Sequence, residues 1–396
     1  STPSLQSVDR QPPTRDPPVA PALPPSSSPS PVSPTTVALT AIPCPGGVIQ
    51  TPEAQCFTFR VPADWENPSK QPWINLFVST YPATGTVQEQ DPVLVIMGGP
   101  GQSGSQYSDE SVRRLHAIRS TRRLIFFDQR GTGLSTPQLG CRQIDPLRYW
   151  FGRVNESDIL KCLDPVRTAG YQLENFDTWQ SARDLQELRL AMGVSRWNLI
   201  ATSYGAILAN TLMHLDESAV RSIVFNSPGL PGKSWLDIDR LQAIRHVFEM
   251  IEHDCLAQAD CAKAFPNIKN AVPRLAQVYE RKRLNVEVIN SQTGISDITQ
   301  INWPEIVNVL ASRAGGGNGS VGLPRVLDHL SRIGERSESK VPPGLFTPRA
   351  LQEAFSSLAY GLNVIIGCRE ERPHTDVGQL RLEGKSYYPY VATNLV

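Results

Sequence analysis

The sequence predicts an α/β fold built on a mostly parallel sheet. Residues 91–228 alternate strand-like apolar runs with helix-like segments, the order expected when crossover helices join parallel strands. Residues 91–104 and 122–135 each carry a short apolar run that leads into a Gly-rich turn, which is typical of a strand buried on both faces. Upstream, residues 56–62 and 73–79 alternate like the two strands of a hairpin.

A serine ends a third apolar run. Ser203 follows Leu-Ile-Ala-Thr and precedes Tyr-Gly-Ala-Ile-Leu, where a strand gives way to a helix. This is the pattern of a nucleophile elbow, in which a strained turn holds a catalytic serine at the top of a sheet. The backbone there passes close to its neighbours, so small residues are needed two positions away, and Ala201 and Gly205 satisfy this. A tight strand–helix junction without catalysis is the alternative.

A glycine-rich loop upstream supplies the context for Ser203. Residues 98–101 read Gly-Gly-Pro-Gly, and glycines let backbone N–H groups face a tetrahedral oxyanion without a side chain in the way. We expect an oxyanion hole formed by Tyr204 and by Gly98 or Gly99, between which the sequence does not choose. The alternative for this loop is a tight turn packed on the sheet.

The order of these motifs resembles that of a known family. Residues 98–101, then 128–133 (Asp-Gln-Arg-Gly-Thr-Gly), then 203–205 resemble the proline iminopeptidase and tripeptidyl aminopeptidase family, with a further likeness over residues 176–199. The resemblance implies a serine exopeptidase with an α/β-hydrolase fold, flanking helices and an inserted helical lid. The chain departs from the family pattern at Met97 (usually His), Ala201 (usually Gly) and Ala206 (usually Gly or Thr).

Composition and the resemblance divide the chain into four parts. We expect a disordered Pro/Ser-rich tether over residues 1–43, because such a segment buries too little apolar surface to fold. The first part of the α/β-hydrolase core follows at 44–230, and a helical lid at 231–354. Residues 355–396 are expected to return to the core on a strand ending near Cys368, with the last strands and helix of the fold absent.

The sequence offers no clear catalytic acid and base for Ser203. In α/β-hydrolases the order is Ser, then Asp or Glu, then His, and the resemblance places the last two after the lid. After Glu371 the only histidine is His374, in a polar stretch without a preceding strand. The others lie on predicted helices or in the lid. We therefore expect residues 1–396 to lack the acid and base and to be inactive alone.

Charged residues near these motifs have two expected roles. A strand-end Asp128 and a turn Arg130 are expected to brace the loop around the site through a charge-assisted bond. Glu370 is a candidate substrate-binding residue, because an aminopeptidase must recognise a free α-ammonium group and a carboxylate does this directly. A solvated surface charge is the alternative for Glu370.

Cysteine spacing predicts local disulfides. Seven cysteines are present, and six form close pairs along the chain, which indicates an oxidising compartment and a secreted, periplasmic or cell-envelope protein. Scattered buried thiols are the alternative. Cys368 has no partner. No spacing suits a metal site, and we expect no metal and no cofactor. The predicted pairs are Cys44–Cys56, Cys141–Cys162 and Cys255–Cys261.

Charge and hydropathy limit the partners. The formal net charge is zero and no long basic run occurs, so we expect neither nucleic acid nor an integral membrane segment, but a peptide substrate with a free N-terminus. The sequence begins with Ser rather than Met, and we expect a mature form without its signal peptide. Two other functions stay open: an esterase on the same scaffold, and a non-catalytic binding protein that has lost its acid and base.

Overall fold

The computed structural model describes residues 37–69, 72–145, 148, 151–233, 238–289, 296–314, 321–334, 340–341 and 358–388. Residues 1–36 of the predicted tether lie outside this set. The last residues of the predicted tether are described, and they form a strand. This strand, β1 (Ala38–Ile42), pairs antiparallel with β2 (Gln55–Pro62), so the predicted boundary at residue 43 is wrong. The Pro-rich composition upstream concealed a short edge strand, which gains its stability by pairing rather than by composition.

The core domain is built on a seven-stranded sheet in the order β1-β2-β3-β5-β4-β6-β7. The pairs β1–β2, β2–β3 and β3–β5 are antiparallel, and β5–β4, β4–β6 and β6–β7 are parallel. Both the predicted hairpin and the predicted parallel strands are therefore confirmed. The other strands are β3 (Trp73–Tyr81), β4 (Val93–Ile96), β5 (Leu124–Phe127), β6 (Trp197–Thr202) and β7 (Val220–Asn226).

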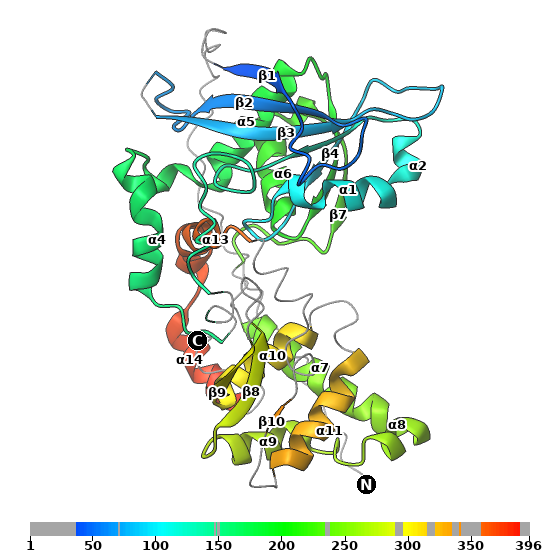
Figure 1. The fold of residues 1–396 in the computed structure, drawn as a ribbon, viewed down its shortest axis with the longest axis vertical. Coiled ribbons are helices and arrows are strands. Elements are labelled where there is room, and N and C mark those ends of the chain that lie inside the picture. The colour runs from blue at the N-terminus through cyan, green and yellow to red at the C-terminus, as the bar shows by residue number, and fades with distance from the viewer. Residues whose placement is uncertain are drawn as a thin grey trace, which may run out of the picture. The chain divides into compact units, whose positions relative to one another are not determined.

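Helices cover both faces of this sheet (Figure 1). Alternate residues of a strand face opposite sides. Leu94 and Ile96 of β4 pack with α4, α5 and α6, whereas Val93 and Val95 pack with α1. Burial on both faces explains why β4 and β5 are apolar at every position. The helices of this domain are α1 (Gly104–Arg114), α2 (His116–Arg119), α4 (Glu156–Thr168), η1 (Leu173–Asn175), α5 (Thr178–Ala191), α6 (Tyr204–Leu215) and η2 (Glu217–Ala219).

The predicted return to the core occurs by a helix and not by a strand. Leu362 and Ile366 of α13 (Tyr360–Ile366) are buried in the same cluster as the sheet and α5. Cys368 lies in the π-helix η4 (Gly367–Glu371), so the expected strand up to Cys368 is wrong. A short apolar run does not distinguish a buried strand from a buried helix. The chain continues as η5 (Arg372–His374) and α14 (Val377–Ser386).

A second hydrophobic core is formed by residues of the predicted lid. It combines helices with a three-stranded sheet in the order β10-β8-β9, a sheet that was not predicted from the sequence. Alternate residues of β8, namely Leu284, Val286 and Val288, are buried, so the strand pattern was present in the sequence. The elements are α7 (Ile238–Ala257), α8 (Ala259–Ala264), α9 (Ala271–Tyr279), β8 (Leu284–Ile289), β9 (Ser296–Ile301), α10 (Trp303–Ala314), α11 (Leu323–Gly334) and β10 (Lys340–Val341).

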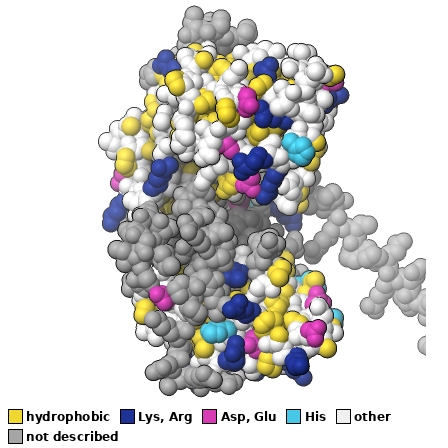
Figure 2. All heavy atoms as spheres, turned by 45° about the vertical axis from the view of Figure 1, so that its right-hand side comes forward, with side chains coloured by type: hydrophobic (Ala, Val, Ile, Leu, Met, Phe, Trp, Pro, Cys, Tyr) yellow, Lys and Arg dark blue, Asp and Glu magenta, His cyan; other side chains and the backbone are white. Residues whose placement is uncertain are grey.

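The surface has no dominant sign of charge on the face shown in Figure 2, where basic and acidic side chains are interspersed. Within the described ranges, no helix combines the length and the apolar character that crossing a membrane requires. The same residues contain no group of His, Cys, Asp and Glu side chains that could hold a metal ion.

All three predicted disulfides are present in the structure: Cys44–Cys56, Cys141–Cys162 and Cys255–Cys261. Their Cα atoms lie 5.1, 5.3 and 5.1 Å apart, as a disulfide requires. The first bond ties the loop before β2 to that strand, and the second ties the segment after β5 to α4. Cys368 is a free and exposed thiol.

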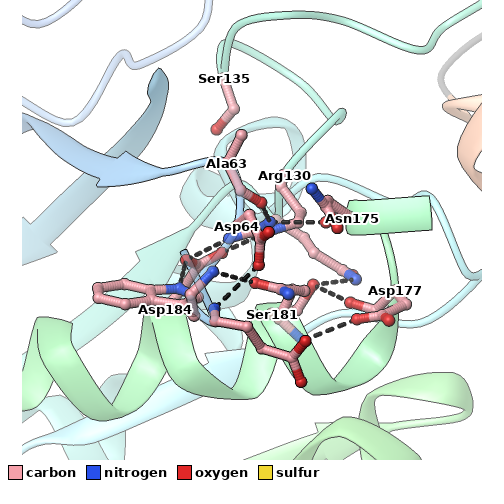
Figure 3. A network of polar contacts seen from close by, with 12 residues as sticks. Ala63, Asp64, Arg130, Ser135, Asn175, Asp177, Ser181 and Asp184 are labelled. Carbon is pink, nitrogen blue, oxygen red and sulfur yellow. Dashed lines mark hydrogen bonds and ion pairs between the residues drawn. The ribbon is translucent and has the colours of Figure 1, made fainter. Parts of the chain in front are cut away.

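A buried ion pair connects the strand-end loops to α5 (Figure 3). Arg130 is fully buried, and its Nε and Nη2 donate to Asp184 Oδ2 and Oδ1 at 2.8 and 2.7 Å. Its Nη1 donates to the carbonyl oxygens of Ala63 and Asn175 at 2.8 and 2.6 Å, and Trp65 Nε1 donates to Asp184. One guanidinium thus fixes three separate segments of backbone relative to one another.

Arg130→Ala is expected to lower the free energy of unfolding by about 3–5 kcal/mol, because Asp184 would remain as a buried and unpaired carboxylate. The matched control is Arg114→Ala, which breaks an exposed pair with Glu110 and should cost about 0.5 kcal/mol or less. Urea unfolding of both variants measures the difference. Equal losses in the two would show that Arg130 does not anchor the loops.

Candidate active site

Ser203 occupies the sharp turn between β6 and α6. Its φ and ψ are 53° and −120°, a backbone conformation that a non-glycine residue adopts only when its surroundings impose it. Backbone hydrogen bonds impose it here. Ser203 N donates to Asn226 O at 3.0 Å, and Ser203 O accepts from Gly229 N at 2.9 Å and from Ala206 N at 3.0 Å. The end of β7 therefore holds the serine in its strained turn.

Close backbone contacts surround this turn, as the small residues in the sequence predict. A Cβ placed on Gly205 would lie 2.7 Å from the carbonyl oxygens of Ile96 and Met97 at the end of β4. Ala201, on the other side of Ser203, is fully buried. The first turn of α6 thus packs directly against the end of the neighbouring strand, and no larger side chain fits.

The glycine loop after β4 lies beside Ser203. A Cβ on Gly98 would lie 2.9 Å from Ser203 Cβ and 2.9 Å from Thr202 O, whereas the nearest neighbours of Gly99 belong to its own loop. Asn363 of α13 fixes the loop, since its Nδ2 donates to Pro100 O at 3.0 Å. Of the two glycines in the predicted oxyanion hole, Gly98 is therefore the one with its backbone against the serine.

Tyr204 follows Ser203 as the first residue of α6, where an N–H has no partner within the helix. Its side chain is 3% exposed and points into a polar network. Its hydroxyl accepts from Gln129 Nε2 at 3.2 Å and is 2.7 Å from Thr178 Oγ1. Burial raises the pKa of this phenol above its ordinary range, so it remains protonated.

Glu370 ends this network. Its Oε1 accepts from Thr178 N at 2.8 Å and its Oε2 from Thr178 Oγ1 at 2.5 Å. Thr178 is the first residue of α5, so the carboxylate sits at a helix N-terminus, where negative charge is favoured. Burial is the largest influence on Glu370 and raises its pKa, and the two Thr178 bonds lower it only in part.

A cavity of about 310 Å³ opens beside Glu370. Three carboxylate residues line it, Asp177, Glu370 and Glu371, together with one Lys. Burial raises the pKa of Asp177 as well. Apolar walls come from Ile207, Leu230 and Ile366. A larger cavity of about 370 Å³, around Ser103 and Gln138, contains none of the predicted site residues.

Asp128 and Arg130 brace the site separately, and not through the single charge-assisted bond that the sequence suggested. Asp128 is fully buried and accepts from Ser105 N, Ser105 Oγ and Leu134 N at 2.8, 2.7 and 2.7 Å. Burial raises its pKa to about 6. Asp128 thereby joins the start of α1 to the turn after β5, whereas Arg130 joins that turn to α5.

None of the six histidines, all of which lie in the described ranges, hydrogen-bonds the Ser203 hydroxyl. His374, the one candidate base after the lid, is exposed in η5. Roles for Gln129 and Thr178 were not predicted from the sequence, although both residues lie in the motifs that carry the family resemblance. An Asp-Thr pair at the start of a helix was the available signal for Thr178.

Residues 91–250 match the family model described as alpha/beta hydrolase fold. Residues 91–250 have an α/β-hydrolase fold. It is 29% identical over 118 residues to a proline iminopeptidase from Xylella fastidiosa, covering 30% of this chain and 26% of that protein. It is 28% identical over 200 residues to a tripeptidyl aminopeptidase from Streptomyces lividans, covering 45% of this chain and 36% of that one. The resemblance inferred from the motifs is confirmed.

The matches cover a limited part of the relatives: the chain spans about a third of the length of these curated proteins or less. Among solved structures, an α/β hydrolase from Novosphingobium aromaticivorans is 14% identical and covers 80% of this chain and 100% of that one, with a TM-score of 0.31.

Gly205→Ala is expected to destabilise the protein by about 1–3 kcal/mol, because its Cβ would meet two carbonyl oxygens at 2.7 Å and push α6 from β4. The matched control is Gly46→Ala, whose Cβ would meet no atom within 4 Å and should change stability by no more than about 0.5 kcal/mol. Chemical denaturation compares the two. A Gly205→Ala protein as stable as the control would refute the tight elbow.

Proposed function

We propose that this protein is a serine hydrolase that removes residues from the free N-termini of peptides through an acyl-enzyme on Ser203. The observation that carries the proposal is the strained turn of Ser203 at the end of β6, with Gly98 against it and Tyr204 opening α6. A serine is placed in this costly conformation where its hydroxyl must project from a sheet toward a substrate.

The chemistry follows from this placement. Ser203 Oγ would attack the scissile carbonyl carbon as its proton passes to a base, and the carbonyl oxygen would become an oxyanion. The N–H of Tyr204 and an N–H of the loop at Gly98 or Gly99 would donate to that oxyanion. Collapse would break the C–N bond, return the proton to the leaving amine and leave an acyl-enzyme on Ser203. Water would then release the N-terminal product.

The cavity beside Glu370 supports recognition of an N-terminal ammonium group. Asp177, Glu370 and Glu371 outnumber the single Lys in its lining, and a buried carboxylate attracts a cation more strongly than an exposed one. The aliphatic side chains in the same lining suit the first side chain of a peptide. We propose that Glu370 binds the α-ammonium group.

None of the described histidines hydrogen-bonds Ser203, and we assign the role of base to none of them. Without a base the hydroxyl stays protonated and is a weak nucleophile. We therefore propose that residues 1–396 expressed alone turn peptides over slowly, and that His374 is dispensable for any residual rate. The same observation favours a second candidate, a non-catalytic protein that binds peptide N-termini.

Three disulfides support an oxidising location. Removal of such bonds usually costs several kcal/mol, and they persist outside reducing compartments. We propose that the protein is secreted or resides in the cell envelope.

The test is a panel of tripeptide and single-residue anilides, each with a free or an acetylated amine, together with short-chain esters. Natively produced protein is expected to cleave only the free-amine anilides, and Ser203→Ala should lower kcat by about 10⁴-fold or more. His374→Ala is the matched control and should change nothing. Cleavage of esters alone would replace the peptidase with an esterase, and loss of all activity in His374→Ala would make His374 the base.

A further inference from the structure

A chain of hydrogen bonds leads from the core to the cavity, whose lining includes Tyr204, Thr178 and Glu370. It passes from Gln129 through the Tyr204 hydroxyl and the Thr178 hydroxyl to Glu370, over donor–acceptor distances of 3.2, 2.7 and 2.5 Å. Tyr204 and Thr178 are 3% and 5% exposed, so water hardly reaches these groups. Each hydroxyl must therefore find its partners within the chain itself.

The chemistry of the groups fixes the direction of these bonds. An amide nitrogen only donates, so Gln129 Nε2 donates to Tyr204. The Thr178 hydroxyl has one proton, which an ionised Glu370 takes. Tyr204 must then donate to Thr178. All three bonds point toward the carboxylate, and every proton in the chain is used.

A neutral Glu370 weakens or reverses this order. A protonated carboxyl is a weaker acceptor, and a proton on Oε2 would turn the chain around. Tyr204 would then accept from both Thr178 and Gln129, and its own buried O–H would lose the Thr178 oxygen as its acceptor. Unsatisfied buried donors are disfavoured. The bonds that run from Tyr204 through Thr178 to Oε2 are therefore strongest when Glu370 carries its negative charge, because an ionised carboxylate is the better acceptor.

We propose that Thr178 and Tyr204 are positioning residues that hold Glu370 as an oriented anion on the cavity wall, so that the site selects a peptide by its terminal ammonium group. This inference rests on the proposed function and names what makes its recognition site work. Thr178 donates to both carboxylate oxygens of Glu370 through its N–H and its hydroxyl. Tyr204 donates to the oxygen of that hydroxyl. The same Tyr204 follows the proposed nucleophile, so ammonium recognition and the elbow share one residue.

The charged groups around Glu370 set the pH dependence. Asp177, the N-cap residue of α5, opposes the ionisation of Glu370 by like charge, whereas Arg369 on its own helix favours it. Glu371 and Lys233 are the other charged residues in the cavity lining. Burial is the largest influence and keeps the pKa of Glu370 above its ordinary value. Because binding needs the anion, affinity should be present at neutral pH and lost as pH falls through this raised pKa.

The test is binding, and needs no turnover. Thermal shifts of the 396-residue chain are titrated with trialanine amide and with N-acetyl-trialanine amide, which differ only in the ammonium group. Wild type should bind only the free amine. Thr178→Val should weaken this binding by about 10-fold or more, the range expected for a lost bond to a charged group, and move its acid midpoint to higher pH. Thr178→Ser, which keeps the hydroxyl, should restore both.

Tyr204→Phe provides a second variant that keeps both Thr178 donors and removes only the phenol, and it should also raise the acid midpoint. Its matched control is Tyr81→Phe, which removes another fully buried phenol bonded to a hydroxyl, that of Ser108 at 2.7 Å, on the opposite face of the sheet.

Equal wild-type binding of both peptides would refute ammonium recognition. The other contrary outcome is that wild type prefers the free amine but Thr178→Val and Tyr204→Phe have the same affinity and the same acid midpoint as wild type. That outcome would refute the positioning role of Thr178 and Tyr204 and leave ammonium recognition standing.

Discussion

The strained turn at Ser203 is the constraint on which the rest of the site depends. A serine holds a φ of 53° only because backbone bonds to Asn226 and Gly229 fix it from the side of β7. The turn brings α6 so close to β4 that Gly205 tolerates no side chain, and it leaves Gly98 beside the serine. Sheet, helix and glycine loop are thus fitted to one backbone conformation.

Two buried networks of polar contacts connect the elements around the Ser203 turn. Arg130 and Asp184 tie α5 to the loops at the strand ends, and Gln129, the residue before Arg130, begins the hydrogen-bond chain that ends at Glu370. Both networks meet on α5, which carries Asp184 and Thr178. Helix α5 therefore joins the buried ion pair to the hydrogen-bond chain that ends at Glu370.

Local patterns in the sequence were enough for the sheet, the elbow and the disulfides. Continuous apolar runs ending at Gly or Ser identified β4, β5 and β6, because strands buried on both faces need no polar residues. Local patterns do not predict contacts between distant segments. Thr178 and Glu370 lie 192 positions apart, and no local sequence pattern predicts their hydrogen bond. The helix at Cys368 was not predicted because tertiary packing decides between strand and helix in a short apolar run. The alternation of β8 was present in the sequence but was not recognised.

The most direct measurement of the central claim is the site at which a fluorophosphonate modifies the natively produced protein, mapped by mass spectrometry of its peptides. The probe reacts with a serine whose hydroxyl is activated beside oxyanion donors. The account predicts one adduct, on Ser203, and none in Ser203→Ala. An adduct on another serine, labelling that survives Ser203→Ala, or no adduct at all would contradict it.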